Sequence, residues 1–483
     1  MGLNAVCVHG HFYQPPREDP LSGLIPYEKG AEPYYNWNER IHAECYRPNA
    51  FLGNFEKISF NIGPTLFGWM EFYDKKTYDA IIEQERRNYH RYGVGNGMAQ
   101  AYNHVILPLA NKQDKTTQIK WGIADFKHRF GHEPMGMWLP ETAVDLETLV
   151  ILSDNDIKFT ILAPWQVKSD ETIHADQPYL ISLPGKRAPM IVFLYNQNLS
   201  TSVSFQSEAT CNAEYFLDNW LLPELISGNH HDQITLIASD GELYGHHKIF
   251  RDKFLAHILN GALKPKKLKI TYPGLWLIDH PPQKFVKLNE DTSWSCHHGV
   301  TRWMGECSCT PGAVWKAPLR KGLNKIAEEI DLQYQKFISQ YTQDAWELRD
   351  AYIHVFLGEI TIINLLERFI KQPLTEQQID EIGMMLAAQY EKQRIFTSCG
   401  WFFESFHRIE PQNNLAYTAQ AVWLTEQVTC VDLKPLTLAL LKQVRDPLTG
   451  LRGDTVFMEK YMRSQNFSED KISYFNPSSS FSS

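Results

Sequence analysis

Short apolar runs alternate with longer amphipathic stretches over residues 1–285. The runs predict strands, because polar or turn-forming residues bound each of them; they lie at 4–8, 57–62, 135–139, 157–162, 190–194, 234–238 and 268–271. Apolar positions with helical spacing lie between several of these runs, at 67–90, 116–129, 146–153, 213–226 and 250–263. Strand–helix–strand alternation is typical of a mainly parallel α/β sheet, and about seven strands over this length favour a barrel.

The pattern changes after this region. Residues 286–319 are irregular and rich in Cys and Trp, and we expect them to cap the site of the preceding barrel. Helical periodicity then extends over 320–470, with predicted helices at 323–340, 345–371, 376–396, 415–428 and 436–444. This region is therefore predicted to be an all-α C-terminal domain. Residues 471–483 are rich in serine and predict a disordered tail.

Bulk properties narrow the classes of partner. The 483 residues carry a net charge of −9, which argues against a nucleic-acid partner, since such proteins normally present a basic surface. No apolar run approaches the length of a membrane span, and the first residues resemble no export signal, so we expect a cytoplasmic protein without a membrane partner. Eight cysteines do not make a disulfide scaffold and are predicted to be mostly buried thiols. The oligomeric state stays open.

Polar and aromatic side chains gather where the apolar runs end. The run at 234–238 is followed by Asp240, Glu242 and two histidines, and the run at 135–139 by Glu141. The carboxyl ends of parallel barrel strands open on one face, so residues distant in sequence can meet there. Because 13% of the residues are aromatic, such a face would also suit flat, weakly polar ligands such as sugar rings.

Glu141 and Asp240 are the carboxyl pair best placed to face each other across a cleft. Glycoside cleavage with retention needs one carboxylate that attacks the anomeric carbon and a second carboxyl that protonates the leaving oxygen. Asp240 and Glu242 share one short turn, so these two flank a sugar less easily. Glu141 could instead belong to a helix N-cap with Asp145, but the aromatic wall of Trp138 beside it favours catalysis.

The first strand ends in the sequence HGHFYQPP, which holds His9, His11 and Gln14. With Asp240, the two histidines would complete a metal set of the kind that a polysaccharide deacetylase uses, and this alternative predicts activity that chelation abolishes and that does not depend on Glu141. Neutral histidines can equally bind sugar hydroxyls without a metal. Because an HxH pair alone is a weak signal, we predict no metal and no cofactor.

Several short sequence motifs follow one another along the chain and add to these observations. They are HGHFYQPP (9–16), ISFNIGPT (58–65), QAYNH (100–104), WLPE (138–141), SDGE (239–242), TSWSC (292–296) and TSCGWFF (397–403). On these motifs, which cover most of the chain, the sequence resembles glycoside hydrolase family 57, in the branch whose barrel is followed by a domain of unknown function. The resemblance implies an incomplete (β/α)7 barrel, a helical C-terminal domain and action on α-linked glucan with retention.

The resemblance also implies roles for single residues. Glu141 would be the nucleophile, Asp240 the general acid/base, His11 the histidine of the first motif, and Glu242 the acid that supports Asp240. We expect the charge of Glu242 to raise the pKa of Asp240. Contacts with an oligo- or polysaccharide substrate are predicted for His9, His11, Gln14, His104, Trp138, Glu242, Trp294 and Trp401, although Trp401 would fit a helical core equally well.

Two departures from the family pattern leave the reaction outcome open. Phe12 and Tyr13 separate His11 from Gln14, and the loops that contact glucan in amylases, branching enzymes and transferases are not recognisable. Hydrolysis and glucan transfer, and the linkage and chain length of the glucan, are therefore not distinguished. A carbohydrate-binding protein on a degenerate barrel is a further alternative, against which the intact carboxylates argue.

The irregular segment contains side chains that bind zinc elsewhere: Cys296, His297, His298, Cys307 and Cys309. A C-x-C pair after an 11-residue gap fits no familiar zinc spacing. We therefore favour thiols packed in a loop over a structural zinc site.

Overall fold

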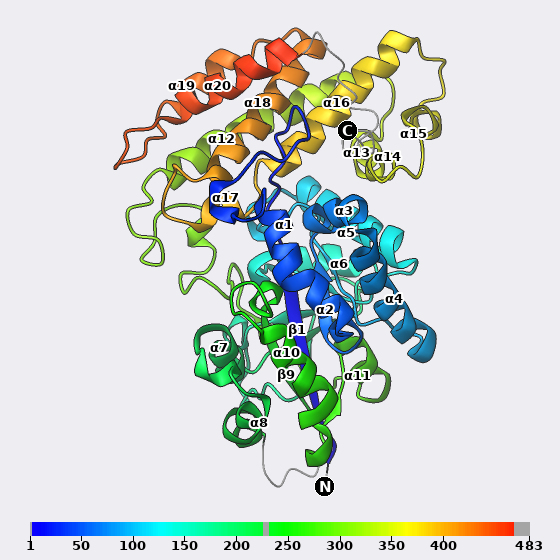
Figure 1. The fold of residues 1–483 in the computed structure, drawn as a ribbon. Coiled ribbons are helices and arrows are strands. Elements are labelled where there is room, and N and C mark those ends of the chain that lie inside the picture. Colours follow the sequence, from blue (N-terminus) through cyan, green and yellow to red (C-terminus); the bar gives the residue numbers. More distant parts are fainter. Residues whose placement is uncertain (1, 226–230, 468–483) are drawn as a thin grey trace. The chain divides into compact units, whose positions relative to one another are not determined.

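The computed structural model describes residues 2–225 and 231–467, and the chain forms two compact units (Figure 1). Unit 1 comprises Met1–Pro16, Tyr27–Ala101 and Phe126–Trp294, and unit 2 comprises Arg17–Pro26, Tyr102–Asp125 and Ser295–Ser483. Each unit is thus assembled from separate segments of the chain, whereas the sequence pattern predicted domains that are consecutive ranges of the chain. The tail predicted at 471–483 lies outside the described residues.

Strand β1 (Asn4–Phe12) is the centre of the sheet in unit 1. Along one edge it pairs in parallel with β9 (Gln233–Asp240) over eight residue pairs. Along the other edge it pairs with β10 (Lys269–Ile270) near its start and with β2 (Ser59–Ile62) near its end. Nearly every residue of β1 and β9 is buried, which explains the uninterrupted apolar runs that predicted these strands.

The other parallel strands continue from β2 as a ring. In ring order they are β3 (Ala99–Gln100), β4 (Met137–Trp138), β5 (Phe159–Leu162) and β8 (Met190–Leu194). Between β8 and β9 the backbone connection is a hydrogen bond from the Asn196 N–H to the Leu236 carbonyl (2.7 Å). Within the described ranges the ring therefore holds seven parallel strands and one loosely joined seam. This confirms the predicted α/β class and incomplete barrel.

Some strand predictions need correction. Strand β3 was missed because two residues are too few to show a pattern. The run at 268–271 contains β10, which pairs with the start of β1 and is not a member of the ring. The remaining strands form antiparallel pairs, β6 (Val167–Lys168) with β11 (Lys287–Leu288) and β7 (Tyr179–Ile181) with β8.

Helices surround the ring in unit 1: α1 (Trp37–Ile41), α2 (Arg47–Phe51), α3 (Pro64–Tyr73), α4 (Lys75–Tyr92), α6 (Leu146–Asp154), α7 (Gln197–Phe205), α8 (Ala213–Phe216), α9 (Leu222–Glu224), α10 (Arg251–His257) and α11 (Pro273–Asp279). The single helix predicted at 67–90 is α3 and α4, because Asp74 leaves the helical conformation and its carboxylate accepts a hydrogen bond from the Thr77 N–H (3.3 Å). The last residue of the helix predicted at 213–226 lies outside the described ranges.

Unit 2 is helical, as predicted. Its helices are α12 (Lys316–Ile338), α13 (Ala345–Ala351), α14 (Ile353–Phe356), α15 (Ile362–Phe369), α16 (Glu376–Arg394), α17 (Cys399–Phe402), α18 (Ile409–Thr429), α19 (Lys434–Leu441) and α20 (Gly453–Phe467), and α5 (Lys112–Phe130) begins in it. Helices α16, α18 and α20 pack side by side (Figure 1). The helix predicted at 345–371 is three short ones. The break between α14 and α15 arises because Gly358 adopts a positive φ of 72° and Thr361 caps α15. Helices α17 and α20 were not predicted.

The cysteines are less buried than the sequence suggested. Cys7, Cys45 and Cys296 are buried, but the other five are half-buried or exposed, so the prediction of mostly buried thiols is wrong. Cys211 and Cys430 are exposed beside helix ends, where a small side chain is tolerated and no apolar run surrounds it.

Four charged side chains in the interior of unit 2 connect α5, α12, α13 and α16. Lys392 Nζ lies 2.5 Å from Asp114 Oδ2 and 2.7 Å from Asp331 Oδ2, while Arg349 Nη1 lies 3.0 Å from Asp114 Oδ1. Burial alone would raise the pKa of Asp114, but Lys392 and Arg349 outweigh it and hold that pKa below its usual range. The charges of the two cations and the two carboxylates balance, so the loss of any one of them would leave a buried charge without compensation.

Removing one member should be costly. We expect Lys392→Met to lower the free energy of unfolding by about 3–5 kcal/mol, because two carboxylates would then share Arg349 alone in a desolvated site. The matched change Lys325→Met, at an exposed ion pair with Glu328 on α12, should cost far less, because solvent screens both charges. Denaturant unfolding of both variants tests this, and equal losses would contradict it.

Candidate active site

One face of β1 and β9 leads from the core to the candidate site. Ala5 and Cys7 of β1 pack in the apolar core beside Ile234 and Leu236 of β9. Because side chains alternate along a strand, His9 and His11 continue the same face toward the carboxyl ends. His11 is paired directly with Asp240, the last residue of β9. The sheet register therefore brings the HxH pair and Asp240 together, as the sequence predicts.

A hydrogen-bond network fixes both histidines. Asn61 Oδ1 accepts from His9 Nε2 (3.2 Å), and Asn61 Nδ2 donates to His11 Nδ1 (2.9 Å) and to Gln100 Oε1 (2.6 Å). Ser59 Oγ donates to His9 Nδ1 (2.9 Å). These bonds are mutually consistent when both imidazoles are neutral and protonated at Nε2. Burial agrees with this assignment, since it lowers the pKa of His9 to about 3 and that of His11 to about 4.

Trp138 lies under the two imidazoles. Its ring stacks on His9 at 4.7 Å and on His11 at 5.1 Å between centroids, and Trp294 meets it edge-on at 5.0 Å. Trp138 is fully buried, whereas Trp294 is partly exposed. Trp138 therefore supports the polar residues from below, and Trp294 is the member of this cluster that can present a face to a ligand.

Glu141 sits on a strained turn directly after β4. Its φ is 57° and that of Thr142 is 49°, both in the left-handed region, where a non-glycine residue costs about 1–3 kcal/mol. Two hydrogen bonds from Trp294 hold the turn: Nε1–H donates to Glu141 Oε2 (3.0 Å) and the backbone N–H to the Glu141 carbonyl (3.0 Å). The N-cap of α6 is Asp145, whose carboxylate accepts from the Thr148 N–H (2.8 Å). Asp145, and not Glu141, therefore caps α6.

Asp240 ends β9 with its side chain exposed to solvent. Protein packed around the carboxyl nevertheless desolvates it, and Glu141 is near enough for its negative charge to act on Asp240. Both effects, desolvation first, raise the pKa of Asp240 to about 7. An accessible carboxyl that keeps its proton near neutral pH can serve as a general acid.

Glu242 has a different environment. It is buried, accepts a hydrogen bond from the Tyr46 hydroxyl (2.8 Å) and also bonds with Gln14. Burial, and secondarily the charge of Asp240, raise the pKa of Glu242 to about 8 against these hydrogen bonds. A carboxyl that is mostly neutral at pH 7 cannot supply the charge that the sequence interpretation assigned to it. Glu141 supplies that charge instead.

Glycines bring the two strand ends close enough to meet. A Cβ on Gly241 would lie 2.4 Å from the ring of Phe12, and one on Gly10 would lie 2.6 Å from the same ring. Because Phe12 is fully buried, its ring cannot move aside, and Asp240 and His11 depend on these two small residues for their approach.

The other predicted contacts lie in unit 2. His104 is buried, with Nδ1 2.6 Å from the Ser398 hydroxyl. Trp401 is fully buried and stacks near Trp315 at 6.4 Å, in the core position that the sequence also allowed. In unit 1 the sequence assigned no role to Tyr46, Gln100 or the exposed Trp165. Gln100 and Trp165 stand at predicted strand ends or motif blocks, but nothing in the sequence links Tyr46 to Glu242, 196 residues away.

Comparison with known proteins agrees with this geometry. The sequence profile of glycosyl hydrolase family 57 matches residues 17–289, which is more than half of the chain. The chain belongs to glycosyl hydrolase family 57. Residues 313–475 match a domain of unknown function, DUF3536. The predicted family, its C-terminal domain and the glycoside hydrolase class are thereby confirmed. A comparison with curated proteins gives no match.

Solved structures share the fold of this family 57 chain. A maltose-forming amylase from Pyrococcus sp. ST04 is 14% identical, with a TM-score of 0.71, over 94% of this chain and 88% of that one. A branching enzyme from Thermococcus kodakaraensis is 15% identical, with a TM-score of 0.58, over 98% and 96%. A 4-α-glucanotransferase from Thermococcus litoralis is 14% identical, with a TM-score of 0.55, over 88% and 60%. At these identities the likeness establishes the fold.

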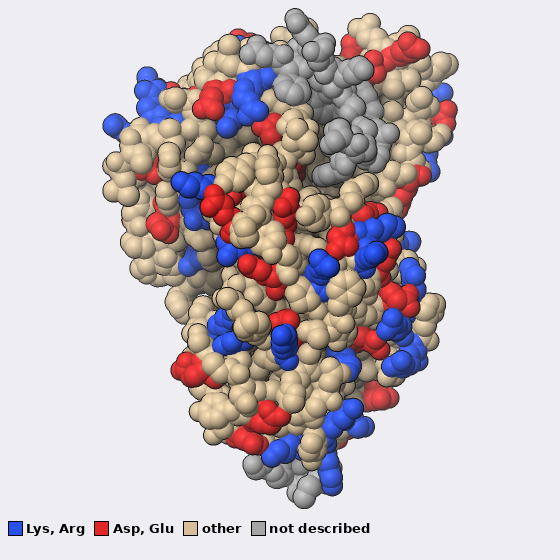
Figure 2. Space-filling view, in the orientation of Figure 1, with Lys and Arg blue, Asp and Glu red and all other residues tan. Residues whose placement is uncertain are grey.

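Two further observations concern the charge of the surface and the hydrophobicity of the helices. Acidic and basic side chains are interspersed over the face drawn in Figure 2. In the described part of the chain, no helix combines the length and the hydrophobicity that crossing a bilayer requires.

The neutral state of Glu242 has a measurable consequence. Its folded-state pKa lies above the unfolded value of about 4.3, so the folded wild type holds a proton that the unfolded chain releases. The contribution of Glu242 to the stability of the wild type should fall between about pH 5 and pH 8, by at most about 1.4 kcal/mol per pH unit. Glu242→Gln can still accept from Tyr46 but cannot ionise, so its stability relative to wild type should rise over this range.

Denaturant unfolding at several pH values measures this difference. Glu147→Gln, at an exposed position on α6, is the matched control and should follow the wild type. A difference between Glu242→Gln and wild type that stays constant with pH would show that Glu242 ionises normally in the folded protein.

Proposed function

We propose that this chain is a retaining enzyme acting on α-linked glucan, with Glu141 as the nucleophile and Asp240 as the general acid/base. The observation that carries the proposal is the electrostatic pairing of the two carboxyls: Glu141 is held by the Trp294 N–H, and its charge helps to raise the pKa of Asp240 to about 7. The names of the proteins with similar folds, an amylase, a branching enzyme and a glucanotransferase, support α-glucan as the substrate class.

In the first step the Glu141 carboxylate attacks the anomeric carbon, and the bond to the leaving oxygen breaks as Asp240 transfers its proton to that oxygen. The product is a glycosyl ester of Glu141. Esterification removes the negative charge of Glu141, and with it one of the two causes that raise the pKa of Asp240. The general acid of the first step thereby becomes a better carboxylate base for the second.

In the second step Asp240 takes a proton from the acceptor, whose oxygen attacks the anomeric carbon and releases Glu141. Water as acceptor gives hydrolysis and a sugar hydroxyl gives transfer, so both outcomes use the same residues. We assign sugar contacts to His11, Gln14 and Trp294, which lie at the strand ends with Asp240. His9 and Trp138, fully buried beneath them, hold these contacts in place.

A deacetylase of the predicted alternative would need metal ligands at this site. Both ring nitrogens of His9 are occupied by Ser59 and Asn61, so neither is placed to bind a metal. This observation favours the glycosidase over the deacetylase. None of the eight cysteines forms a disulfide, as in a reducing compartment, which supports the expected cytoplasmic location.

Substitution of the two carboxyls tests the proposal. We expect Glu141→Gln and Asp240→Asn each to reduce turnover of the true α-glucan by at least about 10³-fold while the fold is retained, because each removes one half of a two-step mechanism. Product chromatography on a panel of α-glucans measures shortening and disproportionation together. Glu147→Gln is the control and should keep wild-type activity. Near wild-type turnover in either site variant would refute the assignment.

Azide separates the two roles. With an activated glycoside, azide should enter the space left in Glu141→Ala and give a glycosyl azide of inverted configuration. In Asp240→Ala the ester still forms on Glu141, so the azide product should retain configuration. NMR of the products distinguishes them, and the opposite pattern would exchange the roles of Glu141 and Asp240.

The pH dependence reports Asp240 in the free enzyme. Since the acid must be protonated, kcat/KM on α-glucan should fall about tenfold per pH unit above about pH 7. An aryl glycoside whose leaving group needs no proton should lack this decline. A kcat/KM that stays constant beyond about pH 8.5 on the natural substrate would contradict a raised pKa at Asp240.

A further inference from the structure

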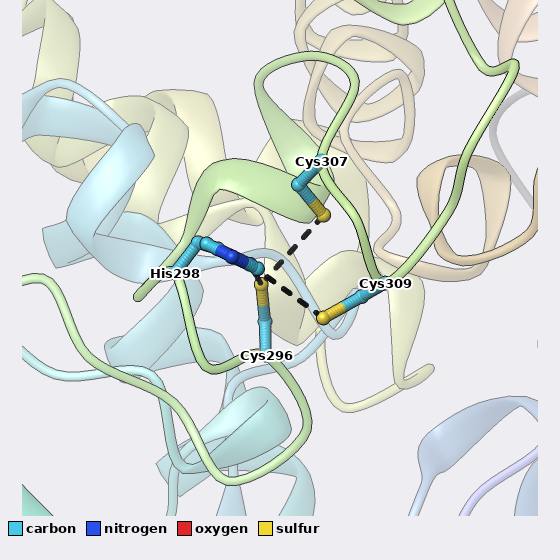
Figure 3. A group of neighbouring side chains, drawn as sticks. All are labelled: Cys296, His298, Cys307 and Cys309. Carbon is cyan, nitrogen blue, oxygen red and sulfur yellow. Dashed lines mark hydrogen bonds between the residues drawn. The ribbon is translucent and has the colours of Figure 1, made fainter.

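Four side chains between β11 and α12, all in unit 2, form a compact group of soft ligands. The ligand atoms of Cys296, His298, Cys307 and Cys309 all lie within 4.8 Å of one another. Figure 3 shows the four side chains pointing toward one another. Within the described residues this is the one group of three or more such side chains placed to hold a metal ion. None of these residues belongs to the proposed catalytic machinery.

The separations fit a tetrahedral ion. Cys296 Sγ lies 3.9 Å from Cys307 Sγ and 3.9 Å from His298 Nδ1, and Cys309 Sγ lies 3.7 Å from His298 Nδ1. Around zinc, with bonds of about 2.3 Å to sulfur and about 2.0–2.1 Å to nitrogen, tetrahedral edges are about 3.8 Å for S···S and about 3.6 Å for S···N. The widest pair needs to close by only about 1 Å to reach such an edge.

The backbone around the sulfurs is also arranged for thiolates. The His298 and Arg302 N–H groups donate to Cys296 Sγ, and the N–H groups of Cys309 and Thr310 donate to Cys307 Sγ. In both ligand pairs the N–H of the second ligand residue, two positions on, thus points back at the first sulfur. N–H donors in this arrangement stabilise a sulfur that carries negative charge.

A buried cation completes the charge balance. Lys316, the first residue of α12, is fully buried and donates from Nζ to the Thr310 hydroxyl (3.1 Å). Burial, and secondarily the charge of Arg302, lower the pKa of Lys316 to about 8, whereas the nearby sulfurs of Cys307 and Cys296 act in the opposite direction. Three thiolates, a neutral imidazole and a divalent ion carry a net charge of −1, which the ammonium of Lys316 would offset.

We propose that Cys296, His298, Cys307 and Cys309 bind one structural zinc ion. A Cys₃His set is typical of closed, four-coordinate zinc sites, and thiolate ligands select zinc over magnesium or calcium. The sequence favoured packed thiols because its spacing, C-x-H-x₈-C-x-C, matches no familiar zinc pattern. In the folded chain two turns bring the pairs together, so linear spacing is a poor guide. The ion would link the two ends of the irregular segment 296–310, next to Lys316 at the start of α12.

Metal analysis of the full-length protein tests the site directly. Purified under reducing conditions without chelator and reconstituted with zinc, the wild type should retain about one zinc per chain after gel filtration. Cys430→Ser, which removes an exposed thiol elsewhere in unit 2, should retain the same amount, and Cys309→Ser should lose most of it. Cobalt in place of zinc should show thiolate charge-transfer absorption in wild type and Cys430→Ser, weakened in Cys309→Ser.

Alkylation of the wild type alone covers the case in which Cys309→Ser does not fold. Zinc should protect Cys296, Cys307 and Cys309 from a thiol reagent, while Cys430 reacts equally with and without zinc; peptide mass spectrometry identifies each site. Zinc-independent labelling of all four, together with no retained zinc, would overturn the proposal. None of these readouts depends on glycosidase activity, so the zinc site and the proposed reaction can fail separately.

Discussion

The hydrogen bonds of the Asn61 carboxamide are the constraint on which the candidate site depends. One amide group bonds to His9, His11 and Gln100 at once, so the ends of β1, β2 and β3 are held in a single register. A slip of β1 by one residue would turn both imidazoles to the opposite face of the strand. The same register pairs His11 with Asp240. The position of the proposed general acid therefore follows from an amide group two strands away from it.

The three carboxyls of the site have distinct protonation tendencies although they lie close together. Burial acts on Asp240 and Glu242, but Tyr46 and Gln14 bond with Glu242, while Asp240 remains open to solvent. Glu141 is instead held by an indole N–H on a strained turn. A buried neutral acid behind an accessible one limits the negative charge in the site. Desolvation and hydrogen bonding thus separate roles that the residue types alone do not distinguish.

The sequence predicted what local pattern determines and missed what depends on distant contacts. Long buried strands such as β1 and β9 were evident from apolar runs, and Glu141 and Asp240 from their positions after such runs. Strand β3, with two residues, had no local signal. The break between α14 and α15 arises from one glycine and one cap that the helical period concealed. Whether Glu242 is charged, and whether the cysteine pairs meet, is decided by residues brought together in folding, and no alternation or spacing records those encounters.

The buried pair of Asp114 and Lys392 sets an order of events during synthesis. The two residues are 278 positions apart, an interval that translation at about 5–20 residues per second takes on the order of 15–55 s to cover. Until α13 emerges, the carboxylate of Asp114 has neither of its cations, and it lacks Lys392 until α16 has followed. Burial of the first part of α5 would be costly before then. The start of α5, which is made early, must therefore wait for α13 and α16. In the nascent chain the first part of α5 would stay exposed and hydrated for most of the synthesis. Chaperones or proteases can act on the chain in that state.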